Sequence, residues 1–198
     1  MAPVLRLLLV CALCWGAPAC AETDADRVAT AALAQVGVTI RYAPEYVRLD
    51  FPGGDLPLDR GVCTDVVIRA LRAVGVDLQL DVHRDMQAHF SAYPRDWGLS
   101  RADANIDHRR VPNLERYFRR RGMALPLGSE ADRFLAGDLV SWRLDGGLPH
   151  IGVVSDRRSA DGRRPLIVHN IGAGAQIEDV LFEWKMHGHF RYFAAPAD

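Results

Sequence analysis

A single cysteine, Cys63, opens the segment "CTDVVIRALRAVG", which is predicted to form a helix. A helix N-terminus presents unpaired N–H groups and a partial positive charge, and both favour a thiolate over a thiol. The thiolate is the nucleophilic form of cysteine, so this position suits covalent catalysis. A small buried apolar residue is the structural alternative, but such a cysteine would fit equally well in the middle of the helix.

A cysteine nucleophile needs a base, and the chain has seven histidines. His150 begins the predicted strand "HIGVVSD", where a sheet would fix its direction. His169 lies near the end of the next predicted strand, "PLIVHNI", where a polar residue can orient the imidazole of His150. Nucleophile, base and orienting residue together form a catalytic relay. Four other histidines are expected to be solvated or to lie in turns: His83, His89, His187 and His189.

The elements that must position these residues are helices in the first half of the chain and strands in the second. Helices are predicted over 23–37, 63–75, 81–90 and 113–122. Strands are predicted over 138–144, 150–156, 165–171 and 189–193. Short turns between successive strands favour an antiparallel sheet with helices packed on one side, which is an α+β domain.

The first 21 residues predict the compartment. Arg6 supplies a positive charge, the apolar run after it is too short to span a bilayer, and Ala19 and Ala21 form an A-x-A-like cleavage site. We therefore expect a signal peptide over 1–21 and a periplasmic or secreted protein. A lipid-modified Cys20 is the alternative, but "APAC" lacks the large aliphatic residue that lipoprotein signals usually carry. No later stretch predicts a transmembrane segment.

Residues 22–198 are long enough for a single domain with a sizeable core. The other three cysteines lie in the predicted leader, so Cys63 cannot form an internal disulfide in the mature chain. The formal net charge of −1 does not indicate nucleic-acid binding. No metal-ligand spacing or phosphate-binding glycine loop is found, so we expect neither a metal nor another cofactor. A monomer is expected. The arginine-rich segment 116–121 is predicted on a solvated helix face, with an anionic cell-envelope polymer as an alternative partner.

The motifs together resemble a known family. A helix-tip cysteine followed by "GDLVSW", "HIGVVSD" and "IVHNIGAG" is similar to the pattern of the NlpC/P60 group of papain-like cysteine peptidases, bacterial envelope enzymes that cut peptides of the peptidoglycan wall. More closely, "YPRDWGL", "GLPHIGVVSD" and "HGHFRYF" resemble a less characterised bacterial branch that is still described as a domain of unknown function. The resemblance spans 22–198. It implies Cys63 as nucleophile, His150 as general base and His169 as the third catalytic residue.

The function implied by this resemblance is that of an exported thiol hydrolase. It would cleave amide bonds in cell-wall peptides through an acyl-enzyme on Cys63. An acyltransferase or amidase acting on another substrate is one alternative, and a non-catalytic wall-binding module on the same scaffold is another. Four polar residues are candidates for substrate binding: Asp65, Asp107, His108 and Asn170. For Asp107 and His108, a role in capping or bridging the loop is the alternative.

Two features depart from the family pattern. The family usually has an aspartate before the cysteine and a serine after it, and here these neighbours are valine and threonine. A tyrosine usually stands three residues before a Gly-Gly pair and helps to build the oxyanion hole, but here that position is Asp50. The oxyanion donor is therefore expected to be the backbone N–H of Cys63 or a tyrosine such as Tyr42 or Tyr46.

Overall fold

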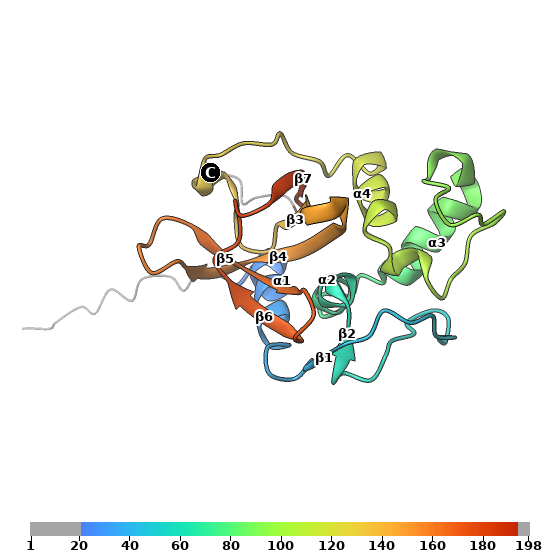
Figure 1. Ribbon diagram of the computed structural model, residues 1–198, viewed down its shortest axis with the longest axis horizontal. Helices are drawn as coiled ribbons and strands as arrows, with labels where there is room; N and C mark the ends of the chain where they lie inside the picture. Colours follow the sequence, from blue (N-terminus) through green and yellow to red (C-terminus); the bar gives the residue numbers. More distant parts are fainter. Residues whose placement is uncertain (1–20, 194–198) are drawn as a thin grey trace, which may run out of the picture.

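The computed structural model describes residues 21–193. Figure 1 shows two helices packed against a sheet and two further helices grouped at one end of the molecule. The helices are α1 (Asp24–Leu33), α2 (Cys63–Arg72), α3 (Leu78–His89) and α4 (Val111–Arg120), with short 3-10 turns η1 (Phe90–Ala92), η2 (Asp107–Arg109), η3 (Ala131–Arg133) and η4 (Asp145–Gly147). Residues 1–20 of the predicted signal peptide, Cys20 included, lie outside the described residues. Within 21–193, no helix has the length and apolar character needed to cross a membrane.

The main sheet has five strands, all paired antiparallel, in the order β6-β5-β4-β3-β7. Its strands are β3 (Leu139–Arg143), β4 (Pro149–Arg158), β5 (Pro165–Asn170), β6 (Ala175–Glu178) and β7 (Lys185–Phe190). A separate parallel pair joins β1 (Arg41–Tyr42) to β2 (Arg60–Gly61), directly before the cysteine helix. The predicted α+β architecture is confirmed.

Several predicted boundaries differ from the structure for local reasons. Helix α3 begins three residues earlier than predicted because Asp77 is its N-cap and accepts the N–H of Gln79 at 3.0 Å. The last strand ends at Phe190, where 189–193 was predicted. Strand β6 was not predicted, because its alternating residues AQIE form an edge strand of only four residues.

Two apolar clusters cover the two faces of the sheet. On the helix side, Val67 and Leu71 of α2 pack with Ile151 and Val153 of β4. On the other side, a second cluster contains Phe134, Val140, Trp142, Val154, Ile167 and Leu181. Because side chains alternate across a strand, β4 contributes to both clusters. The strand that carries His150 is therefore anchored on both faces.

The "GD" turn before β3 is fixed by close packing and by a buried carboxylate. Gly137 has a φ of +85°, and an added Cβ would lie 2.4 Å from the carbonyl oxygen of Ala25 in α1. Asp138 is 1% exposed and accepts hydrogen bonds from His189 Nε2 and Arg191 Nε, each at 2.7 Å. Burial alone would raise the pKa of Asp138, but the bonds from Arg191 and His189 hold it below its usual value. The expectation that His189 lies in a turn was wrong, because it is buried in β7 against this carboxylate.

We expect Asp138→Asn to lower the free energy of unfolding by about 2–4 kcal/mol, because it leaves the half-buried Arg191 and the buried His189 without their negative partner. Urea denaturation at neutral pH measures this loss. Asp156→Asn is the matched control, since the Asp156 side chain in β4 is 66% exposed. Equal midpoints for the two variants would show that the Asp138 network does not stabilise the fold.

Candidate active site

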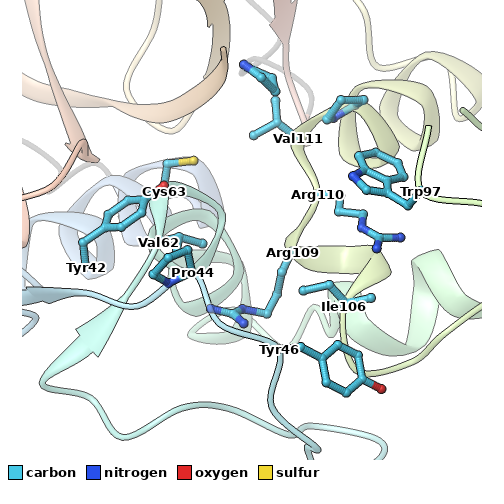
Figure 2. Close-up of a pocket in the computed structure, with 12 residues that line it drawn as sticks. Tyr42, Pro44, Tyr46, Val62, Cys63, Trp97, Ile106, Arg109, Arg110 and Val111 are labelled. Carbon is cyan, nitrogen blue, oxygen red and sulfur yellow. The ribbon is translucent and has the colours of Figure 1, made fainter.

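Cys63 is the first residue of α2, and Val62 is the N-cap. Its thiol is free and lines a cleft of about 400 Å³, although the residue is only 5% exposed. Figure 2 shows the sulfur at the tip of the helix, with Tyr42 and Pro44 on its side of the cleft and Trp97 across from them. The predicted position of the cysteine at a helix N-terminus is confirmed.

A buried ion pair fixes the tip of α2. The carboxylate of Asp65 accepts the N–H of Val62 at 2.7 Å and two hydrogen bonds of 3.0 Å from Arg109 Nε and Nη2. Arg109 also donates to the carbonyl oxygen of Ala43 at 2.9 Å. The Asp65 and Arg109 side chains are 4% and 2% exposed. This pair therefore ties the start of the cysteine helix to η2 and to the loop before it.

A side chain of the main sheet holds Gly61, the residue two before the cysteine, by a hydrogen bond. Asn170, at the end of β5, donates from Nδ2 to the carbonyl oxygen of Gly61 at 3.0 Å. An added Cβ at Gly61 would lie 2.9 Å from the Cβ of Asp65, so glycine is required where β2 meets the first turn of α2. Asn170 thus positions the backbone that leads into Cys63.

The two predicted strand histidines meet in a chain of polar side chains. His150 Nε2 lies 2.9 Å from His169 Nδ1, and His169 Nε2 lies 2.8 Å from a carboxylate oxygen of Glu178 on β6. Gly152 permits this approach, because an added Cβ would lie only 2.6 Å from the Ile167 side chain and 3.1 Å from the His169 Cβ. The spacing "HIG" therefore serves the contact between β4 and β5.

The charge of Glu178 favours one pair of tautomers for the two imidazoles, although its approach to His169 Nε2 meets the distance of an ion pair and not the geometry of a hydrogen bond. The carboxylate of Glu178 favours a proton on Nε2 of His169, so Nδ1 of His169 becomes an acceptor. His150 must then donate from Nε2, and its Nδ1 keeps a lone pair. Within residues 21–193, this Nδ1 makes no hydrogen bond. It is the nitrogen that can receive a proton from a thiol.

Trp184 covers the bond between the two histidines. Its ring centroid lies 5.7 Å from that of His150 and 5.9 Å from that of His169, and Trp142 approaches His150 from β3 at 6.0 Å. His150 and His169 are 3% and 0% exposed. The aromatic rings exclude water from the hydrogen bond and hold both imidazoles in one orientation.

The thiol lies next to the strand that carries His150. Ile151, the residue after His150, belongs to the same apolar cluster as Cys63. The backbone N–H groups of Ile151, Thr64 and Cys63 favour the ionised form of the sulfur. Among the described residues, no hydrogen bond joins the sulfur directly to His150. The structure therefore brings His150 and His169 together beside Trp142 of the second cluster, whereas Cys63 packs with Ile151 in the helix-side cluster, and the three catalytic roles stay predictions.

Burial controls ionisation at this site. It raises the pKa of Cys63 to about 12, although the N–H groups of Ile151 and Thr64 act in the opposite direction. It lowers the pKa of His150 to about 3, to which the neighbouring His169 contributes, and it lowers the pKa of His169 against the opposing charge of Glu178. The resting site thus holds a thiol and neutral imidazoles. The N-terminus of α2 alone does not outweigh the loss of hydration.

None of the four candidate substrate-binding residues lines the Cys63 cleft. Asp65 and Asn170 hold the helix tip, as described above. Asp107 accepts the N–H of Asp103 at 2.6 Å and pairs with Arg110 at 3.0 Å, which is the bridging alternative. His108 is 2% exposed, and burial lowers its pKa to about 3. The loop 105–110 contributes to the cleft through other side chains.

The cleft walls include residues that sequence reasoning did not select. Arg109, Arg110 and Val111 lie on one wall, and the guanidinium of Arg110 lies 4.1 Å from the ring centroid of Trp97. The motifs "YPRDWGL" and "ANIDHRRVP" contain these residues and were the available signal. The described part of the chain contains no cluster of three or more His, Cys, Asp or Glu that could hold a metal ion.

The two tyrosines named as oxyanion donors differ in their surroundings. The hydroxyl of Tyr46 accepts from Asn105 at 2.8 Å and donates to Asp103 at 3.1 Å. Tyr42 lies beside Cys63 (Figure 2), and no hydrogen bond occupies its hydroxyl within 21–193. Burial and the nearby Cys63 raise the pKa of Tyr42, so its hydroxyl keeps its proton. Of the two, Tyr42 is the available donor.

Comparison with known proteins identifies the family. The family described as "Domain of unknown function (DUF1287)" matches residues 29–192. This chain belongs to that family. It is 59% identical over 166 residues to "Uncharacterized protein YijF" of Escherichia coli (strain K12), covering 84% of this chain and 80% of the relative. The prediction that the chain carries a domain of unknown function is confirmed.

A solved structure, "Structure of NlpC1 from Trichomonas vaginalis", is similar to this chain with a TM-score of 0.48 and 13% sequence identity. The match covers 91% of this chain and 48% of that chain. The DUF1287 chain therefore spans about half the length of the NlpC1 chain.

Proposed function

We propose that this protein is an exported cysteine hydrolase that cleaves amide bonds in cell-wall peptides through an acyl-enzyme on Cys63. The observation that carries the proposal is the pairing of His150 with His169, beside Glu178, at the start of the strand whose next residue, Ile151, packs with Cys63. The resemblance of "GDLVSW", "HIGVVSD" and "IVHNIGAG" to wall peptidases supports the substrate class. The predicted signal peptide supports export.

In the first half of the reaction, the Cys63 sulfur attacks the carbonyl carbon of an amide in the cleft, and the thiol proton passes to Nδ1 of His150. The pKa of Cys63 and that of His150 each describe a group that becomes charged beside a neutral partner. Proton transfer between them creates a thiolate and an imidazolium together, and the attraction between these two charges offsets part of the cost of burying them. His169 accepts a hydrogen bond from the imidazolium, and Glu178 adds a negative charge behind it. The relay thus stabilises the ion pair that burial opposes.

In the second half, the tetrahedral intermediate collapses and its C–N bond breaks. His150 donates its proton to the leaving amine, and a thioester on Cys63 remains. Water then attacks the thioester carbon, gives a proton to His150, and releases the carboxylic acid, while the sulfur regains the proton. The N–H of Cys63 and the hydroxyl of Tyr42 would stabilise the oxyanion in both halves.

Cleavage of purified wall fragments tests the proposal. We expect the mature protein to generate new amine termini that mass spectrometry can identify, and Cys63→Ala to abolish them. His150→Ala should reduce the rate by at least about 100-fold, because it removes the general base. His89→Ala is the matched control, since that side chain is 51% exposed on α3. Products from Cys63→Ala equal to those from the wild type would contradict the hydrolase.

Tyr42→Phe tests the oxyanion assignment. We expect kcat to fall by about 10–100-fold with little change in KM, because the lost donor acts chiefly on the developing charge. Tyr46→Phe should have a smaller effect on kcat, since the Tyr46 hydroxyl is already bonded to Asp103 and Asn105. An unchanged kcat in Tyr42→Phe would assign the oxyanion to backbone donors alone.

One observation favours a non-catalytic module as the second candidate. The thiol is buried and protonated at rest, as expected for a cysteine that only packs. Such a module would bind wall fragments through the cleft without forming products. The same assay separates the two candidates. For a binding module, the wild type would release no products, and both the wild type and Cys63→Ala would still bind the wall fragments.

A further inference from the structure

A second groove continues from the Cys63 cleft. It has a volume of about 590 Å³ and shares Pro112 and Pro149 with the cleft, so the two spaces meet at these prolines. The groove is lined by side chains of α4, of β3 and of β7, and its arginines are Arg116, Arg119 and Arg143. A peptide held at Cys63 would enter this groove on passing the prolines.

A buried carboxylate organises one wall of the groove. Glu115 is 2% exposed and accepts two hydrogen bonds of 2.8 Å from Arg143, and His187 Nδ1 lies 3.0 Å from it. Burial alone would raise the pKa of Glu115, but the bonds from Arg143 hold it below its usual value. Glu115 therefore stays ionised and fixes the Arg143 guanidinium against the wall.

The other two arginines retain donors for a ligand. Arg116 is exposed and makes no ion pair or hydrogen bond with any residue of 21–193. Arg119 has only a distant pair with Glu115, at 3.8 Å, and donates from Nη2 to the carbonyl oxygen of His187. The only other acid on the groove is Asp96, which is exposed. The groove thus contains three guanidinium groups and two carboxylates, and the carboxylate of Glu115 is already paired with Arg143.

We propose that this groove binds a carboxylate of the substrate peptide, several residues away from the bond at Cys63. The proposal rests on the proposed function in taking a peptide as the ligand of the cleft. Arginine matches a carboxylate with paired N–H donors, and the prolines at the junction have no N–H to compete for it. The arginines of 116–121 would thus act in part as a recognition element for acidic peptides.

The test measures binding, so it does not depend on turnover. Peptide fragments released from purified wall are used as isolated and after their carboxyl groups are converted to amides with carbodiimide and ammonia. Calorimetry measures the dissociation constant of each form with the Cys63→Ala protein. We expect amidation to weaken binding by about 10-fold or more, since it removes a charge-assisted hydrogen bond.

Adding Arg116→Gln and Arg119→Gln to Cys63→Ala should abolish the difference between the two peptide forms. Arg84→Gln is the matched control, because Arg84 is exposed on α3 and lies outside both grooves. Equal binding of both forms, a preference that survives the double substitution, or no binding of either form would overturn the proposal. A carboxylate preference in a protein without hydrolytic activity would support the groove and contradict only the proposed function.

Discussion

The buried pair between Asp65 and Arg109 is the interaction on which the site depends. It caps the first turn of α2 through the N–H of Val62 and joins segments that are 44 residues apart in the chain. Removing one partner of such a pair leaves an uncompensated charge in the interior, so its geometry is strongly held. The thiol of Cys63 is consequently presented at a fixed point above the sheet, and the wall of the cleft that contains Arg109 is fixed with it.

The sheet supplies the complementary constraint. Antiparallel pairing places His150, His169 and Glu178 on three neighbouring strands, so that a proton on one ring determines the proton on the next. Trp184 keeps water from the bond between the two histidines, which strengthens that bond but also makes isolated charges costly there. Burial favours the neutral resting state and opposes the ion pair that the proposed reaction would form, and the relay would offset part of that cost. Catalysis under this account depends on creating both charges together.

The local features of the sequence predicted much of this arrangement. The helix at Cys63, the antiparallel sheet and the contact between the two strand histidines follow from apolar periodicity, glycine positions and chain order. The sequence did not reveal Glu178, because it lies on an edge strand of only four residues. It did not reveal the role of Arg109, because the partner of Arg109 is distant in the chain. A resting thiolate at the helix tip, paired with His150 and favoured by the helix N-terminus, was expected. This was wrong, because burial raises the pKa of Cys63 through packing that no local pattern contains.

The central claim is that His150 receives the proton of Cys63. The rate at which iodoacetamide alkylates Cys63 at pH 7 tests it most directly, since alkylation requires the thiolate and no substrate. The account predicts that His150→Ala slows alkylation by about 10-fold or more, because the buried thiol then has no base to ionise it. His89→Ala, an exposed histidine on α3, should leave the rate unchanged. An equal rate in the wild type and His150→Ala would contradict the account, because it would show that the thiol ionises without this histidine.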